Sequence, residues 1–175
     1  MPDPTFKIDS TTVLSKSGTT VSIADDVGFP STVFAYVHFS STPTTINGST
    51  IVAFTDRTQS THSSTYGWDL TNHYYRVEKA GVYIISVIME VNGTGGAELG
   101  IYKGSSASGT TISGETIIGR CQVFGPTASD NHSTMIVRQL SVNNVLYAKN
   151  TSGTSRNFNA ADESNTGMNI CLIRT

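Results

Sequence analysis

The densest group of side chains that could recognise a ligand lies between residues 61 and 75. Trp and Tyr rings have broad apolar faces and a polar edge, so they can stack on sugar rings or anchor a protein interface. A second interpretation stays open, because the same rings could cover one end of a β-sandwich or a seam between subunits. The binding interpretation assigns a glycan or partner site to Tyr66, Trp68, His73, Tyr74 and Tyr75.

The sequence lacks the motifs on which common enzyme classes depend. Residues 109–116 have the glycine spacing of a phosphate-binding loop, but Glu115 stands where a lysine would reach the phosphates. The four histidines show neither the HxH nor the HExxH spacing of metal sites. We therefore predict that the protein is not an enzyme, that it has no cofactor, and that residues 109–116 form a hairpin loop.

Two adjacent acidic residues, Asp25 and Asp26, are the candidates for a metal site. Ca²⁺ prefers oxygen ligands, and two carboxylates could bind it together with backbone carbonyls. Paired acids in a turn are more often solvated, so the sequence predicts no metal, with calcium at these two residues as the alternative.

The charge and hydropathy of the chain exclude several kinds of partner. The net charge is −2 and only 14% of the residues are charged, so the basic face that nucleic acid requires is missing. The longest apolar stretch, residues 81–91, is far shorter than the ~20 residues that span a bilayer. We predict no nucleic-acid binding and no membrane insertion.

Cys121 and Cys171 are predicted to be buried, reduced thiols.

Apolar side chains alternate with a period of two along much of the chain, which predicts strands rather than helices. Residues 32–39 are apolar on both faces, as in a strand that lies between two sheets or between a sheet and a neighbouring subunit. About ten such strands, joined by polar loops, predict an all-β fold over residues 31–175, either a two-sheet sandwich or a jelly roll. On the central strand of this sandwich, the residues predicted to face the core are Gly81, Tyr83, Ile85, Val87 and Met89.

The first 30 residues differ from the rest, because their predicted strands are short and closely spaced. A few isolated strands are not stable alone. Residues 1–30 are therefore expected to form an arm that docks on its own domain, on another copy or on a larger assembly. The apolar residues available for this docking are Phe6, Ile8, Val13, Leu14, Val21, Ile23 and Phe29.

Four segments of residues 32–175 resemble the C1q/TNF-like jelly-roll family. The run YRVEKAGVYIIS at 75–86 is similar to the family's strand motif fTxPxxGxYxFs, and AELGIYKG at 97–104 to its next strand. Residues 141–148 are similar to its LxxGDxVyv element and residues 164–173 to its last strand, with Asn143-Asn144 in place of the usual Gly-Asp and Met168 in place of an aromatic. The resemblance implies a jelly roll and a homotrimer, in which Ca²⁺ is sometimes bound on the axis.

The leader at residues 6–30, with its STTVLS and VGFP segments, looks like the leaders of tailed-bacteriophage fibre and head-decoration proteins. Together the two resemblances imply a capsid decoration protein of the virion, with the major capsid protein as its partner. An acid and two prolines follow Met1 where a signal peptide would be basic and then apolar, so we expect assembly in the host cytoplasm and release by lysis. The alternatives are a fibre tip that recognises host surface glycans and a cellular C1q-like ligand-recognition domain.

Overall fold

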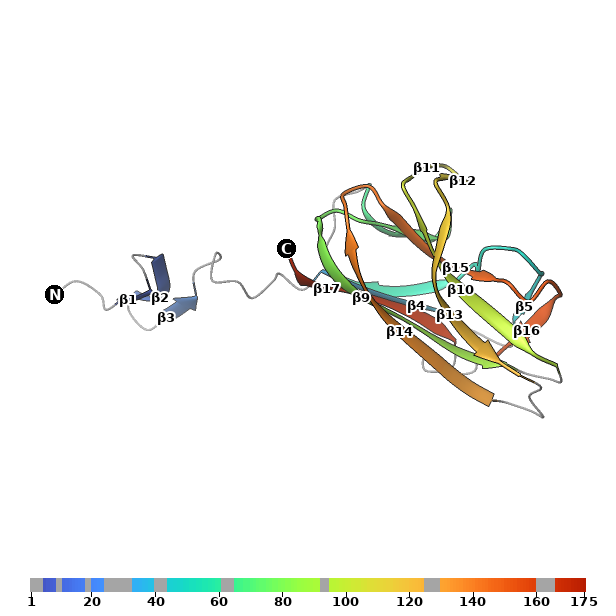
Figure 1. Cartoon of the computed structure of the whole chain (residues 1–175). Helices are drawn as coiled ribbons and strands as arrows, with labels where there is room; N and C mark the ends of the chain where they lie inside the picture. Colours follow the sequence, from blue (N-terminus) through green and yellow to red (C-terminus); the bar gives the residue numbers. More distant parts are fainter. Residues whose placement is uncertain are drawn as a thin grey trace. The chain divides into compact units, whose positions relative to one another are not determined.

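The structure is a computed structural model that describes residues 5–8, 11–17, 20–23, 33–39, 44–60, 65–91, 95–124, 130–159 and 166–175. These residues form seventeen strands, and none of them belongs to a helix that could cross a membrane. The chain divides into two compact units, Met1–Thr32 and Val33–Thr175. Figure 1 draws both units, and each is described by itself below.

The N-terminal unit is an antiparallel sheet of three strands, β1 (Thr5–Ile8), β2 (Thr11–Ser17) and β3 (Thr20–Ile23). β2 is the central strand, with Leu14 opposite both Phe6 and Ile23. Only the backbone of these strands is described, so the docking role of Phe6, Ile8, Val13, Leu14, Val21 and Ile23 stays a prediction. Phe29, Asp25 and Asp26 lie outside the described residues, and so does the calcium alternative.

The larger unit consists of two antiparallel sheets, as the sequence predicts. The first sheet contains, in spatial order, β13 (Thr116–Val123), β10 (Ala97–Gly104), β15 (Val145–Asn150), β8 (Tyr74–Arg76) and β7 (Gly67–Asp69). The second contains β5 (Thr44–Ile46), β16 (Arg156–Phe158), β9 (Gly81–Val91), β17 (Gly167–Arg174), β4 (Phe34–His38) and β6 (Asp56–Gln59), with β14 (Asp130–Leu140) beside β9. A small hairpin, β11 (Ser106–Ser108) and β12 (Thr111–Ser113), occupies the predicted loop around residue 109.

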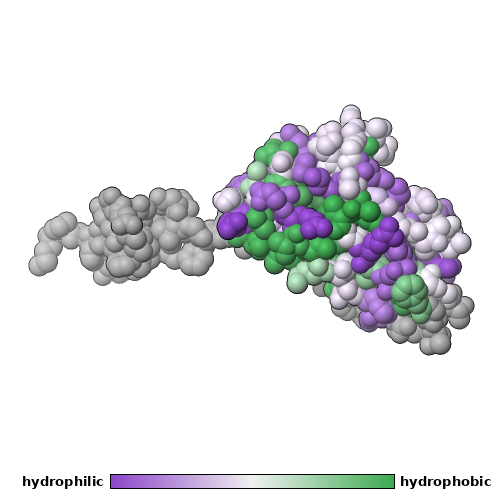
Figure 2. Space-filling view, in the orientation of Figure 1, coloured by the Kyte–Doolittle hydropathy of each residue, from purple (hydrophilic) through white to green (hydrophobic). Residues whose placement is uncertain are grey.

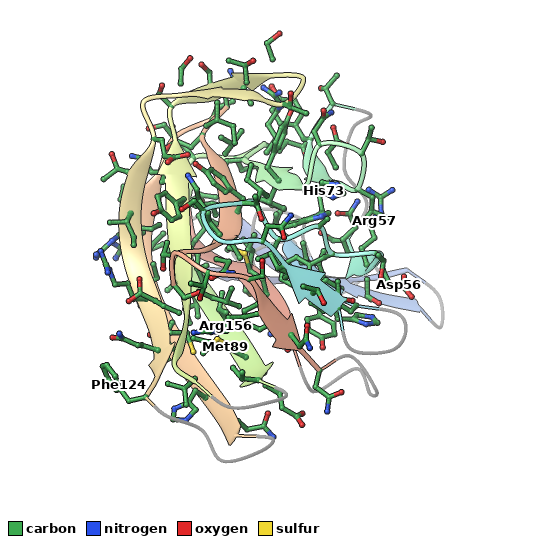
Figure 3. The ribbon with its side chains drawn as sticks, turned by 90° about the vertical axis from the view of Figure 1, so that its right-hand side faces the viewer. Asp56, Arg57, His73, Met89, Phe124 and Arg156 are labelled. Atoms are coloured by element: carbon green, nitrogen blue, oxygen red, sulfur yellow. The ribbon has the colours of Figure 1, made fainter. Side chains whose placement is uncertain are left out.

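The core lies between the two sheets, and β9 is its central strand. β9 pairs with β14 over its whole length and with β17 on its other side. The predicted core side chains Tyr83, Ile85, Val87 and Met89 are all fully buried. Figure 3 shows Met89 inside the sandwich, whereas Phe124, which is 81% exposed, projects outward. At Gly81 a side chain would not fit, because a Cβ there would come within 2.3 Å of the Arg174 carbonyl oxygen.

The two cysteines differ in their surroundings, which corrects the prediction that both are buried. Cys121 is buried in the core, and burial raises the pKa of its thiol to about 11. Cys171 is only partly buried, because it points to the outer face of β17 beside Phe34 and Ile84 on the neighbouring strands. Both thiols are free.

A buried amide joins β15 to the loops at one end of the sandwich. The Asn150 side chain is fully buried, and its Nδ2 donates to the carbonyl oxygens of Ile46, Asn47 and Thr154 at 2.9, 3.2 and 3.0 Å. Its Oδ1 accepts from the Ser152 backbone N at 3.1 Å. One side chain thereby satisfies backbone groups of the distant segment 46–47 and of the loop 152–154 that follows β15.

The substitution Asn150→Ala is expected to lower the free energy of unfolding by about 2 kcal/mol, because an unpaired buried polar group costs about 1–3 kcal/mol. Chemical denaturation at one fixed protein concentration would measure the change. Asn157→Ala is the matched control, since the Asn157 side chain is exposed and its Oδ1 accepts only from the exposed Thr45 hydroxyl. Equal losses in the two variants would contradict this role for Asn150.

Candidate functional site

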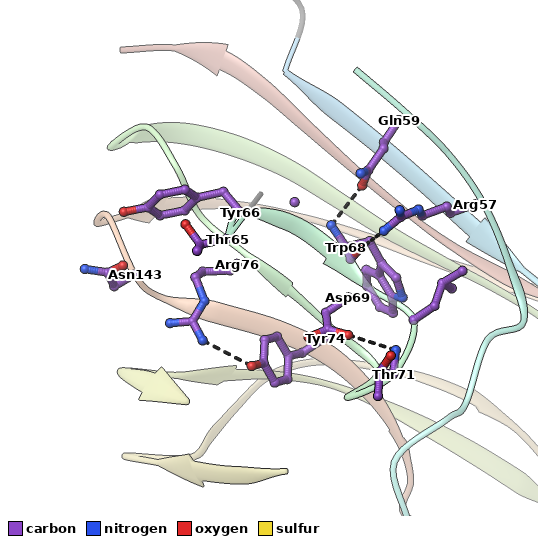
Figure 4. Close-up of a pocket in the computed structure, with 12 residues that line it drawn as sticks. Arg57, Gln59, Thr65, Tyr66, Trp68, Asp69, Thr71, Tyr74, Arg76 and Asn143 are labelled. Atoms are coloured by element: carbon purple, nitrogen blue, oxygen red, sulfur yellow. Dashed lines mark hydrogen bonds between the residues drawn. The ribbon is translucent and has the colours of Figure 1, made fainter. Parts of the chain in front are cut away.

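The described residues form a pocket of about 790 Å³ where the edge of one sheet meets the edge of the other. Figure 4 shows the side chains around it. β6 belongs to the second sheet, and β7 and β8 to the first, so both layers of the sandwich contribute to its wall. The lining residues are Arg57, Gln59, Thr65, Tyr66, Gly67, Trp68, Asp69, Leu70, Thr71, Tyr74, Arg76 and Asn143.

The alternation of β8 decides which of its side chains reach the pocket. Successive residues of a strand point to opposite faces. Tyr74 and Arg76 therefore lie on the face that lines the pocket, while Tyr75 points into the main core. The Arg76 guanidinium donates to the Tyr74 hydroxyl at 3.1 Å and to the Ala107 carbonyl at 2.9 Å. These bonds hold Arg76 beside the Tyr74 ring, with 5.5 Å from Cζ to the ring centroid.

The turn between β7 and β8 is built around Asp69. Its Oδ1 accepts from the backbone N of Thr71 at 2.8 Å and of Asn72 at 3.0 Å, and its Oδ2 accepts from Asn72 Nδ2 at 2.7 Å. Burial raises the pKa of Asp69, but these hydrogen bonds and the charge of His73 outweigh it, so the net shift of the pKa is downward. The carboxylate is therefore ionised at neutral pH.

Side chains of β6 connect the two sheets at this edge. Arg57 Nη1 donates to the Trp68 carbonyl oxygen, and the Trp68 backbone N donates to Gln59 Oε1 at 2.8 Å. These two bonds use the backbone groups of Trp68 that point away from β8. Arg57 also lines the pocket, so it both joins the layers and contributes a positive charge to the wall.

The structure divides the five predicted site residues between the core and the pocket. Trp68 and Tyr75 are 1% and 0% exposed and belong to the main core, where Trp68 lies edge-on to Phe54 at 5.8 Å between centroids. Their rings are not accessible to a ligand. These two residues therefore cover one end of the sandwich, which is the second interpretation of the aromatic cluster. The Tyr75 phenol stays neutral, because burial raises its pKa strongly.

Of the other three predicted residues, two line the pocket and one does not. Tyr66 is half-buried and lines the pocket, and Tyr74 lines it with most of its ring covered. His73 is half-buried but is not part of the lining. Burial lowers the pKa of His73, and the nearby charge of Asp69 only partly opposes this shift. A binding role for Tyr66 and Tyr74 remains a prediction.

Seven polar lining residues are absent from the sequence-based assignment. They are Arg57, Gln59, Thr65, Asp69, Thr71, Arg76 and Asn143. For Arg76 the signal was present, since it is two residues from Tyr74 in a strand and must share its face. Asn143 has a φ of 69°, a left-handed conformation that glycine adopts most readily, and it occupies the position where the C1q/TNF-like pattern usually has glycine.

A second candidate surface is the outer face of the sheet around β9. One row across it contains Phe34, Cys171, Ile84 and Val137, on the paired strands β4, β17, β9 and β14. The next row contains Tyr36, Asn169, Ser86 and Met135. We define the β9 face as the apolar members of these rows and of the following one, namely Phe34, Tyr36, Ile84, Ile88, Met135, Val137 and Cys171.

The β9 face leaves large apolar side chains open to solvent. Met135 is 66% exposed, Val137 49% and Phe34 36%. Figure 2 shows hydrophobic surface over the region in which Figure 1 draws β9 and β17. Strand 34–38 is thus covered by the core on one side only, and its second apolar side is on this face. Contiguous apolar surface of this kind marks protein–protein contacts.

Glu115, in the loop that has the glycine spacing of a phosphate-binding loop, is bound by two side chains of β15. Glu115 Oε1 accepts from Lys149 Nζ at 3.1 Å, and its Oε2 accepts from the Tyr147 hydroxyl. The pKa of Glu115 is lowered, mainly because the Tyr147 hydroxyl donates to the carboxylate. Burial acts in the opposite direction, and the hydrogen bond and charge of Lys149 lower the pKa further. A carboxylate held in this way would repel a phosphate, in line with the sequence interpretation.

Comparison with solved structures establishes the fold of the larger unit. Eiger TNF from S. frugiperda superposes with a TM-score of 0.64 at 13% identity, covering 81% of this chain and 92% of that chain. The globular domain of zebrafish complement 1qA gives 0.59 at 16% identity, covering 82% and 99%. Murine APRIL gives 0.57 at 11% identity, covering 81% and 99%. The prediction of a C1q/TNF-like jelly-roll sandwich is confirmed.

Other comparisons add no further assignment. No protein-family model and no curated protein matches the sequence. These comparisons give no support to the similarity of residues 6–30 to leaders of tailed-bacteriophage proteins.

Proposed function

We propose that this protein is a non-enzymatic recognition module that assembles as a homotrimer through the β9 face. The observation that carries the proposal is the row of exposed apolar side chains on the β9 face, with Met135, Val137 and Phe34 as its most exposed members. The C1q/TNF-like fold supports it, because the sequence resemblance to that family implies a trimer. The motifs missing from the sequence and the occupied Glu115 support a role in binding rather than catalysis.

A second copy of this chain is the occupant that best fits the β9 face. The side chains of this face lie in rows that run across the paired strands of one sheet. They therefore form a continuous surface rather than isolated apolar residues. No charged side chain interrupts the two rows from Phe34 to Val137 and from Tyr36 to Met135. Charged residues are depleted at the centre of stable interfaces, whereas Tyr, Phe and Met are enriched there.

Light scattering on a sizing column tests the assembly. We expect a mass of about 56 kDa, three times the 18.6 kDa of the chain, both without and with EDTA. A mass that falls when EDTA is added would show that a cation holds the trimer together and would promote the calcium alternative. A stable monomer would overturn the proposal.

A narrower proposal concerns where the trimer acts. We propose that it is a capsid decoration protein of a bacteriophage virion, anchored to the major capsid protein by the arm at residues 1–30. The N-terminal sheet supports this role, since its described strands β1, β2 and β3 form a compact unit of their own. We expect the full chain, but not residues 31–175 alone, to bind undecorated capsids. Binding to host envelopes instead would favour a fibre tip, and binding to neither would contradict both.

A further inference from the structure

We propose that the pocket between β6, β7 and β8 binds the carboxylate group of an acidic saccharide. The inference deepens the proposed recognition function and rests on it, because it gives the module its ligand class. The pocket belongs to one protomer, however, and can be tested separately from the assembly.

The first argument is the charge of the pocket wall. Arg57 and Arg76 contribute two guanidinium groups, against one carboxylate, Asp69. Asp69 already accepts three hydrogen bonds within its own turn, which leaves it little capacity to bind either arginine. The salt bridges among the described residues join Arg120 to Glu98 and Lys149 to Glu115, so neither lining arginine forms an ion pair with a described carboxylate.

The second argument is that both arginines are held in place and still have free donors. Each guanidinium has five N–H groups. Arg57 uses Nη1 for the Trp68 carbonyl, and Arg76 uses Nη2 for Tyr74 and Ala107. The remaining N–H groups of a positioned guanidinium suit the two oxygens of a carboxylate, which Arg binds in a fork-like geometry.

The third argument concerns the rest of the ligand. Amide and hydroxyl groups of Gln59, Thr65, Thr71 and Asn143 also line the pocket. An apolar ligand would leave such groups without hydrogen bonds, and an inorganic anion would reach few of them. A hydroxyl-rich ring can pair with several at once and can lie against the half-buried ring of Tyr66.

The size of the pocket is consistent with this ligand. About 790 Å³ falls in the range of ~300–1,000 Å³ that small-molecule sites occupy.

Calorimetry on the full chain tests the ligand class. The probes are oligosaccharides of glucuronate, galacturonate and N-acetylneuraminate, each beside its carboxyl-reduced counterpart, together with acetate and a tetraglutamate peptide. We expect at least one acidic oligosaccharide to bind ten times more tightly than its reduced counterpart and than acetate or the peptide. If none does, or if the reduced sugars bind equally well, the proposal is wrong.

Matched variants locate the site. Arg76→Gln should weaken binding of that oligosaccharide at least tenfold. Asn143→Gly keeps the left-handed backbone and should weaken it about threefold. Arg120→Gln makes the same charge change on β13, at the opposite edge of the first sheet, and should leave the affinity unchanged. Equal losses in the Arg76 and Arg120 variants, or no loss in the Arg76 and Asn143 variants, would overturn the assignment.

The outcomes for the two proposals can be told apart. A trimer of about 56 kDa that binds no acidic sugar would refute the ligand and leave the assembly intact. A monomer that binds an acidic sugar with the expected variant pattern would refute the assembly and leave the pocket assignment intact.

Discussion

The variant Val137→Asp is expected to be a folded monomer of about 18.6 kDa where the parent chain is a trimer. Val137 is 49% exposed in the protomer, so a carboxylate at this position remains hydrated in the free chain. In the trimer it would be buried among Phe34, Ile84 and Cys171 of the β9 face without a partner, which costs several kcal/mol. Light scattering measures the mass, and circular dichroism reports whether the strands persist.

Val142→Asp is the matched control for this variant. Val142 is 43% exposed and carries the same side chain, but it lies in the turn between β14 and β15 rather than on the β9 face. The control should keep the trimer mass. Dissociation of both variants, or of neither, would argue against the β9 face as the interface.

The variant Trp68→Ala is expected to lose about 3–5 kcal/mol of unfolding free energy, the range typical of truncating a buried aromatic side chain. Trp68 is among the largest fully buried residues and packs edge-on against Phe54. Its removal would leave a cavity at the junction of the two sheets. Chemical denaturation followed by circular dichroism measures the loss at a fixed protein concentration.

Tyr66→Ala is the comparison for Trp68. Tyr66 lines the same pocket but is half-buried, so its truncation should cost much less stability. If Trp68→Ala proved as stable as the parent chain and lost only ligand binding, the assignment of Trp68 to the core would be wrong, and its first interpretation as a contact residue would return.

The sequence predicts the strands of the sandwich well where one face is continuously apolar. In β9, alternate residues from Tyr83 to Met89 are all apolar and all fully buried. Of the two causes expected for the double apolar character of residues 32–39, a place between two sheets does not apply, because Val37 faces the core while Phe34 lies on the open β9 face. Contact of that face with a neighbouring subunit stays a prediction. The local pattern suffices for these strands, because a strand that packs one face on the other sheet needs apolar residues at every second position.

The pocket could not be predicted in the same way, because its wall depends on contacts between residues distant in sequence. β6 reads DRTQ, which has no apolar alternation, so no strand was expected there. Its pairing with β4 brings Arg57 and Gln59 to the edge of β7. The cluster of aromatic residues lies at this pocket, but the alternation of β8, with Tyr75 opposite the buried Trp68 of β7, is what separates Tyr74 from Tyr75.

The side-chain bonds from β6 to β7 have a consequence for solubility. The edge of a sheet offers unpaired N–H and C=O groups to which a strand of another molecule can add, and such additions lead to aggregation. β7 is one of the two edge strands of the first sheet and has only three residues. Because Gln59 and Arg57 already bind the N–H and C=O of its central residue, Trp68, a foreign strand finds no hydrogen-bonding group there with which to begin a new ladder.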